Sequence, residues 1–100
     1  MWELRYADPV YEDLRALRAA DRSRVRGAIE GSLMNEPDKP TRNRKLLTDV
    51  KSPLDVKRGV WELRVGEIRV FYDVDSDDEV VTVLWARRKP PHMTTENILP

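Results

Sequence analysis

The stretch WELRVGEIRVFYDV, residues 61–74, places Arg64 and Arg69 in a segment that otherwise alternates apolar and polar residues around one glycine. A guanidinium group donates two hydrogen bonds to phosphate oxygens and stays charged at any working pH. The two arginines therefore indicate a site that holds phosphate. The alternative is that they only solvate an open sheet face and pair with neighbouring acids, which is common on antiparallel sheets.

The alternation of side chains along strands predicts which of them share a face. Glu62 and Arg64 are expected on one face of the first strand, away from the core, and Arg69 on the same face of the second strand. At the end of the last strand Arg88 can join them, or Arg87 if the register shifts by one residue. We expect a cluster of guanidinium groups on the sheet face that the helices leave open.

His92 is the only histidine of the chain, and an imidazole titrates near neutral pH, so it could act as a general acid or base. It follows two prolines and has no fixed partner in the sequence. An exposed histidine in a tail is the alternative interpretation.

A second group of arginines recurs at helical spacing nearer the N-terminus. Its members are Arg15, Arg18, Arg22 and Arg26. Such a row could contact phosphates or an acidic partner. The alternative is a solvated helix face that Glu12 and Asp13 support through ion pairs.

Length and composition limit the class of protein. One hundred residues form one domain, residues 1–100, with a single core. No apolar run approaches the ~18 residues that span a bilayer, and no charged start precedes an apolar stretch, so we expect a cytoplasmic protein without membrane contact. With no cysteine and one histidine, neither a disulfide framework nor a structural metal is expected.

Charge is balanced in total and uneven along the chain. Lys plus Arg and Asp plus Glu both number 18, so the net charge is +0, which argues against binding nucleic acid by bulk attraction. Between Pro37 and Gly59, seven basic residues and three acids give a net of +4. Three more positive charges follow at residues 87–89, and five acids lie between Asp73 and Glu79. We expect a basic side and an acidic tip.

Local patterns predict a helical hairpin after a short strand. Residues 1–7 alternate like a strand with one buried face. Asp8 before Pro9 predicts a helix that runs to about residue 20, because the aspartate can cap and proline fits the first turn. Asp21 predicts the start of a second helix, which ends at the break before Pro37.

Residue patterns in the second half of the chain predict strands. Leu46 and Leu47 are expected to anchor the connector, part of which should be strand or functional because long structureless loops are rare in small domains. Residues 56–65, 67–75 and 79–88 have strand character, with turn residues between them. The expected fold class is α+β, in the order β-α-α-β-β-β, with a mostly antiparallel sheet and a helical hairpin on one face.

This arrangement resembles the RelE/ParE superfamily of toxins from bacterial and archaeal toxin-antitoxin modules. The resemblance rests on the N-terminal strand, the helical hairpin, the connector RNRKLL, the run VWELRVGEIRVFYDVD and the closing VVTVLWARRK. Its most specific element is W-x-L-R-x-G-x-x-R-x-x-Y, from Trp61 to Tyr72. It implies a RelE-like fold and the toxin component of a type II module, with a cognate antitoxin as partner.

In the ribonuclease branch the resemblance implies ribosome-dependent cleavage of messenger RNA, which inhibits translation and uses no metal or cofactor. A base helps the ribose 2′-hydroxyl attack the phosphate, arginines hold the developing charge, and an acid protonates the leaving oxygen. Arg69 matches the arginine of the R-x-x-Y element, and Arg88 the arginine that closes the last strand. We assign Glu62 as base and His92 as acid, where ribonuclease members often carry lysines and a late tyrosine.

Further basic residues are expected to bind ribosomal or messenger RNA. They are Arg44, Lys45, Lys57, Arg58, Arg64, Arg87 and Lys89.

The resemblance leaves two other activities open. A ParE-type toxin would inhibit DNA gyrase by binding it, and would need neither acid nor base. A degenerate member would only bind its antitoxin. In each case we expect a segment of the antitoxin to wrap the domain and to cover apolar surface around Phe71 and Trp85.

Overall fold

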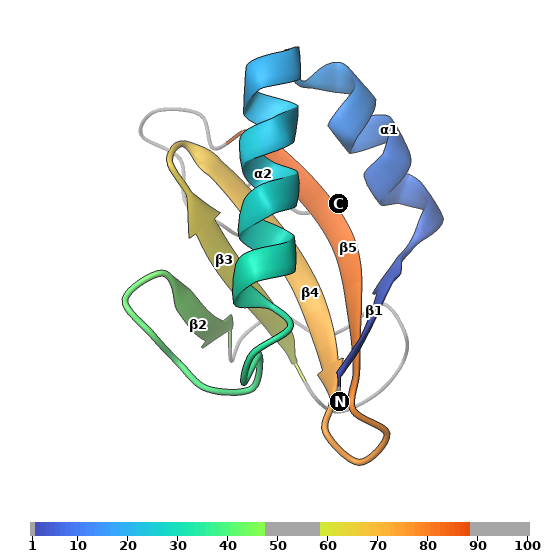
Figure 1. Cartoon of the computed structure of the whole chain (residues 1–100), viewed down its shortest axis with the longest axis vertical. Coiled ribbons are helices and arrows are strands. Elements are labelled where there is room, and N and C mark those ends of the chain that lie inside the picture. The colour runs from blue at the N-terminus through green and yellow to red at the C-terminus, as the bar shows by residue number, and fades with distance from the viewer. Residues whose placement is uncertain (1, 48–58, 89–100) are drawn as a thin grey trace.

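The computed structural model describes residues 2–47 and 59–88. Within these residues two helices and a five-stranded sheet follow the order β-α-α-β-β-β-β (Figure 1). The elements are β1 (Glu3–Tyr6), α1 (Asp8–Ala16), α2 (Ala19–Ser32), β2 (Arg44–Leu47), β3 (Val60–Val65), β4 (Ile68–Asp75) and β5 (Val80–Arg88). The predicted α+β class is confirmed, and the connector contributes an additional strand, β2.

The strands are ordered β1-β5-β4-β3-β2 across the sheet. The pair β1 and β5 is parallel, whereas the three other pairs are antiparallel. Both helices lie on one face of this sheet (Figure 1). The predicted mostly antiparallel sheet with a helical hairpin on one face is therefore confirmed.

The helix starts differ from the prediction by a few residues. Helix α1 begins at Asp8 with Ala7 as its N-cap, and Pro9 lies in the first turn, where its missing N–H costs nothing. Helix α2 begins at Ala19, and Asp21 lies in its first turn, where the positive end of the helix dipole stabilises a carboxylate. Neither of these two described helices is long and apolar enough to cross a membrane.

The main core lies between the helices and the sheet. Its buried members from the helices and the loop that follows are Val10, Leu14, Val25, Ile29 and Leu33. Its buried members from the strands are Trp61, Leu63, Val65, Ile68, Val70, Tyr72, Val74, Val81, Val83 and Ala86. Each fully buried Val, Leu or Ile side chain contributes about 1.5–3 kcal/mol, so this layer holds the helices on the sheet.

A bulge interrupts β5 between its two halves. Phe71 pairs with Trp85 and the next residue of β4, Tyr72, pairs with Val83, so that Leu84 is an extra residue in β5. One extra residue reverses the faces of all side chains beyond it. The bulge therefore decides which arginine at the end of β5 faces away from the helices.

The sheet face opposite the helices is not open, contrary to our prediction. Val60, Phe71 and Leu84 form a second apolar cluster in which each residue is at most 2% exposed. Leu47 and Trp85 pack against it and are partly buried. The expectation that an antitoxin covers Phe71 is therefore wrong, since the protein already buries that ring, whereas cover of the partly buried Trp85 stays a prediction.

Strand β2 holds the connector at one edge of the sheet. Leu47 packs against the second cluster, as expected, whereas Leu46 is 42% exposed, and its expected anchoring role is wrong. Neighbouring residues of a strand point to opposite faces, so two adjacent leucines cannot both enter one core.

Candidate functional site

A tight turn brings the two arginines of the hairpin together. Gly66 and Glu67 connect β3 to β4, and Gly66 has a φ of 60°, which L side chains rarely adopt. The turn pairs Arg64 directly with Arg69, and the next strand pairs Arg69 with Arg87. Arg64, Arg69 and Arg87 are thus in register across three strands, and the expected cluster of their guanidinium groups stays a prediction.

Arg69 is buried and bonded to the turn. The residue is 8% exposed, and its Nη1 donates to the carbonyl oxygens of Gly66, at 2.7 Å, and of Ile68, at 3.2 Å. Its Nε has no hydrogen-bond partner and lies 4.0 Å from Oε1 of Glu62. One of the three nitrogens of this guanidinium, Nη1, is therefore committed to holding the hairpin.

Glu62 lies between two cations. Its side chain is 4% exposed, and the same oxygen, Oε1, is 4.0 Å from Nε of Arg69 and 4.0 Å from Nζ of Lys45. Lys45 comes from β2 and faces Glu62 across the strand pair, with 60% of its side chain exposed. The carboxylate is thus partly neutralised from both sides, and Lys45 connects it to charge that is exposed to solvent.

A shallow hollow of about 130 Å³ lies beside this pair. It is lined by Thr41, Arg42, Asn43, Arg44, Lys45, Glu62 and Arg64. The lining combines exposed basic side chains with one buried carboxylate, a set that could hold a phosphate beside a hydroxyl donor. Lys45 and Arg64, both predicted to bind RNA, meet here.

Arg87 is held at the edge of the sheet by α1. Its Nε lies 3.6 Å from Oδ2 of Asp13, and the same oxygen accepts a hydrogen bond of 3.1 Å from the backbone N–H of Ala86. Its guanidinium also lies 6.0 Å from the centroid of the Trp85 ring. Sequence reasoning missed Asp13, because a contact across 73 residues leaves no local signal.

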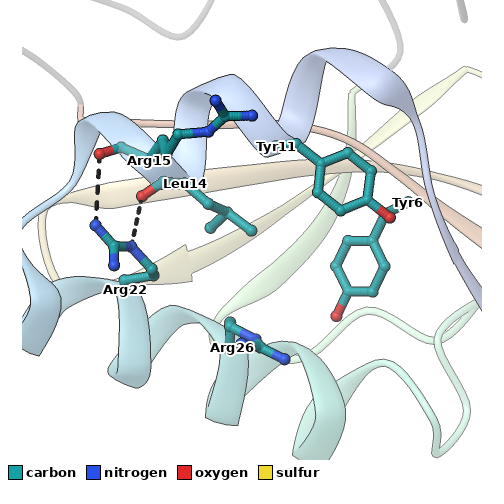
Figure 2. A pocket seen from close by; sticks show the side chains of 6 residues that line it. All are labelled: Tyr6, Tyr11, Leu14, Arg15, Arg22 and Arg26. Atoms are coloured by element: carbon teal, nitrogen blue, oxygen red, sulfur yellow. Dashed lines mark hydrogen bonds between the residues drawn. The ribbon is translucent and has the colours of Figure 1, made fainter.

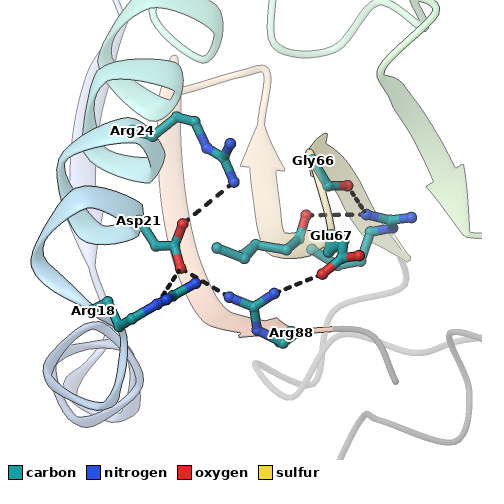
Figure 3. A network of polar contacts seen from close by, with 8 residues as sticks. Arg18, Asp21, Arg24, Gly66, Glu67 and Arg88 are labelled. Atoms are coloured by element: carbon teal, nitrogen blue, oxygen red, sulfur yellow. Dashed lines mark hydrogen bonds and ion pairs between the residues drawn. The ribbon is translucent and has the colours of Figure 1, made fainter. Parts of the chain in front are cut away.

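Arg88 does not join the row, and our expectation for it is wrong. It pairs with Ile68 on the helix-covered face, since the bulge in β5 reverses the faces of the last residues. Its Nη2 lies 2.8 Å from Oδ2 of Asp21 in α2, and its Nη1 lies 2.7 Å from Oε2 of Glu67 (Figure 3). Arg88 therefore ties α2 to the β3–β4 turn.

Arg44 is also occupied within the fold. It is 9% exposed, and its Nη1 donates to the carbonyl oxygens of Ser32, at 2.8 Å, and Asn35, at 3.2 Å. These carbonyls lie at and just beyond the C-terminal end of α2, where a cation is favourable. Its predicted role in RNA binding would require this guanidinium to leave the helix end.

The remaining predicted site residues lie outside the described residues. They are Lys57, Arg58, Lys89 and His92. Within residues 2–47 and 59–88, no three carboxylate or imidazole side chains are grouped so as to hold a metal ion.

Comparisons with known proteins identify the family. A model of the family described as "ParE toxin of type II toxin-antitoxin system, parDE" matches residues 4–89. No curated protein matches the sequence. The first structural relative is in the RelBE2 toxin-antitoxin complex of Mycobacterium tuberculosis, with a TM-score of 0.68 and 24% identity over 88% of this chain and 98% of that one.

Two further solved structures have the same fold. The archaeal RelE-RelB complex of Pyrococcus horikoshii gives a TM-score of 0.68 and 21% identity over 90% of this chain and 97% of that one. A YoeB/ParE toxin from Agrobacterium tumefaciens gives a TM-score of 0.62 and 17% identity over 88% of this chain and 99% of that one. Since the family model covers most of the chain, the protein belongs to the ParE toxin family, within the RelE/ParE superfamily of type II toxin-antitoxin toxins.

Proposed function

We propose that this toxin acts in the cytoplasm by binding a protein target, DNA gyrase, as a ParE-type toxin would. The observation that carries the proposal is the state of the two arginines that would hold a scissile phosphate. Arg69 is 8% exposed with its Nη1 on two carbonyls, and Arg88 lies between Asp21 and Glu67. A toxin that acts by binding its target does not require either arginine to be free. The family model, which is described as a ParE toxin, supports the same activity.

The candidate base fits this proposal as well. A general base must lie within hydrogen-bond reach of the proton that it removes. The Glu62 side chain is 4% exposed, with Arg69 on one side and Lys45 on the other. Substrate would have to move these neighbours before its 2′-hydroxyl could approach the carboxylate.

Purified gyrase tests the proposal. We expect the toxin to inhibit supercoiling and to produce linear, cleaved plasmid, while messages on ribosomes remain intact. Cleavage of ribosome-bound message without any effect on gyrase would overturn it. An Arg69→Lys variant, which keeps the buried charge, should retain gyrase inhibition if its fold is retained.

A ribosome-dependent messenger RNA endoribonuclease is the second candidate. Its specific support is the hollow beside Glu62, where exposed Lys45 and Arg64 accompany a carboxylate, and the position of Arg87 across from Arg69. In this reading Lys45, Arg64 and Arg87 bind RNA and Glu62 is the base. Message cleavage that is lost in Glu62→Gln and Lys45→Ala variants would favour it over gyrase.

For either activity we propose a cognate antitoxin as partner. The first structural relatives are toxins solved together with their antitoxins, RelBE2 in Mycobacterium tuberculosis and RelE-RelB in Pyrococcus horikoshii. Co-expression with the neighbouring reading frame should relieve growth inhibition and yield a stable complex. A host that grows normally without the neighbour would leave antitoxin binding as the sole function.

A further inference from the structure

Strand β1 lies at one edge of the five-stranded sheet, and β2 lies at the other. The inner edge of β1 pairs with β5 in parallel, and the backbone N–H of Glu3 donates to the carbonyl oxygen of Glu79 at 2.8 Å. In a parallel ladder, alternate residues bond to the same neighbouring strand. The backbone groups of Trp2, Leu4 and Tyr6 therefore point away from β5, where the sheet has no further strand among the described residues. Such an edge is a template for another strand.

The helix-covered face of β1 carries an apolar row. Trp2, Leu4 and Tyr6 pack against the main core and are only partly buried. Figure 2 shows Tyr6 beside Tyr11 of α1, with 6.1 Å between the ring centroids. A further strand that continues this row would remove apolar surface from water, which favours association. The edge thus offers apolar side chains as well as backbone groups.

The opposite face of β1 carries one acid and one base. Glu3 and Arg5 form an ion pair within the strand, and 54% and 62% of their side chains are exposed. They lie on either side of Leu4, at equal distance from it in the sequence. A two-fold axis at Leu4 would therefore set each Glu3 against Arg5 of a second copy. The charge pattern of this strand is its own complement.

We propose that the outer edge of β1 pairs antiparallel with β1 of a second copy of this chain, about a two-fold axis at Leu4. Leu4 then faces Leu4, and Trp2 faces Tyr6 of the other copy, in pairs that exchange backbone hydrogen bonds. Glu3 faces Arg5 of the other copy in the closer pairs without hydrogen bonds, where opposite charges stabilise a sheet. The two sheets become one continuous sheet. The inference rests on this edge and not on the toxin's proposed target.

Charge selects this register and direction. A slip of two residues would set Glu3 against Glu3 or Arg5 against Arg5, and like charges directly opposite destabilise a strand pair. Glu3 pairs with Val80, so the acidic turn at residues 75–79 lies by the N-terminal end of β1. Antiparallel pairing brings the turn of each copy toward Arg5 of the other and keeps the two acidic turns apart.

The other edge strand lacks this self-complementarity. Strand β2 reads Arg44, Lys45, Leu46 and Leu47, with no acid. Two antiparallel copies of it would set basic residues against leucines or against each other. Basic side chains on an edge strand, lysine above all, disfavour pairing with another strand. Of the two edges, β1 is therefore the one suited to a second copy.

Sedimentation equilibrium of the purified full chain tests the proposal. The short contact predicts a weak, reversible dimer, with a dissociation constant of about 10–100 µM at low salt. Glu3→Lys and Arg5→Glu should each raise this constant at least ~10-fold, because each sets like charges opposite one another. Arg18→Glu is the matched control and should dimerise normally, since Arg18 is 86% exposed and contacts Asp21 of α2. A parent chain that is monomeric up to about 1 mM, or equal dimerisation of all variants, would overturn the proposal.

Mixing the two charge variants tests the pairing by a gain of binding. The Glu3→Lys chain carries two positive charges on this face of β1, and the Arg5→Glu chain carries two negative ones. The mixture should form a heterodimer about as tight as the parent dimer, and the double variant Glu3→Lys/Arg5→Glu should recover the homodimer. Circular dichroism shows that each chain is folded. If folded chains give neither the heterodimer nor the recovered homodimer, the proposed register is wrong.

A peptide distinguishes a second copy from other occupants of the edge. A peptide with residues 2–7 should dissociate the dimer, whereas a scrambled peptide of the same composition should not. A monomeric chain that binds both peptides equally would contradict the proposal and assign the edge to strands of other proteins. These measurements contain neither gyrase nor ribosomes, so failure of the target proposal and failure of dimerisation appear in different assays.

Discussion

Arg69 of β4 lies directly opposite Arg87 of β5, while Arg88 points to the helix-covered face and contacts Asp21. The two neighbouring arginines of β5 therefore have different environments. Arg87 contacts Asp13 of α1, and Arg88 contributes to the contact between α2 and the hairpin turn. Because Arg69 is buried and bonded to that turn, its first contribution is to stability.

Arg69→Ala should destabilise the protein by about 1–3 kcal/mol, since two carbonyl oxygens of the turn and the buried Glu62 lose a cationic partner. Urea unfolding measures the change. Arg64→Ala is the control, because Arg64 is exposed and pairs with Arg69 across the strands, and it should change stability by no more than about 0.5 kcal/mol. Equal destabilisation by the two variants would contradict the structural role of Arg69.

Asp13→Ala should lower the free energy of unfolding by about 1–2 kcal/mol, because the buried N–H of Ala86 loses its hydrogen-bond acceptor. Asp13→Asn keeps an acceptor oxygen and removes only the charge beside Arg87, so it should cost clearly less. Hydrogen exchange of the Ala86 amide checks this directly. Exchange should accelerate in the alanine variant, and an unchanged rate would show that Asp13 does not hold this edge of β5.

Gly66→Ala should destabilise the protein by about 1–2 kcal/mol, because the left-handed backbone conformation costs free energy for alanine and not for glycine. The new Cβ would also lie 2.9 Å from Nη2 of Arg24, which would have to move. Gly27→Ala is the matched control in the middle of α2, where a Cβ meets nothing within 4 Å. It should stabilise by about 0.5–1 kcal/mol, and opposite signs for the two variants are the critical result.

Tyr72 should make stability fall at alkaline pH. Its hydroxyl donates to the carbonyl oxygen of Pro37 at 3.2 Å, and burial raises its pKa above the ordinary value of 10.0. The unfolded phenol ionises above pH 10.0 while the folded one stays protonated, so its contribution is complete below that pH and is lost above it.

The matched variant isolates this group. Tyr72→Phe should cost about 1 kcal/mol near neutral pH through the lost hydrogen bond, and should flatten the alkaline decline. Unfolding free energies measured on both sides of pH 10 test this. An identical alkaline decline in both proteins would assign it to other groups.

The sequence predicted those parts of the fold that local patterns encode. Alternation placed Glu62, Arg64 and Arg69 on one face, and Asp8 with Pro9 located the start of α1. The bulge at Leu84 was not predictable, because residues 83–86 are all apolar and show no alternation, and it decided between Arg87 and Arg88. The burial of the sheet face opposite the helices was not predicted either. Two polar residues on one face of a strand usually indicate that this face is exposed to solvent.

The site was predicted less completely because long-range pairing assembles it. Lys45 approaches Glu62 only because the connector forms β2 beside β3. The contacts of Arg44 with the end of α2 depend on the same strand. A basic residue in a connector carries no signal of whether it faces solvent or a helix end.

The proposal that this toxin binds a protein target is tested most directly by incubating the purified chain with DNA gyrase and, in parallel, with ribosomes translating a defined message. We predict loss of supercoiling with accumulation of linear plasmid, and full-length message on the ribosomes. Cut message together with unimpaired supercoiling would contradict the proposal.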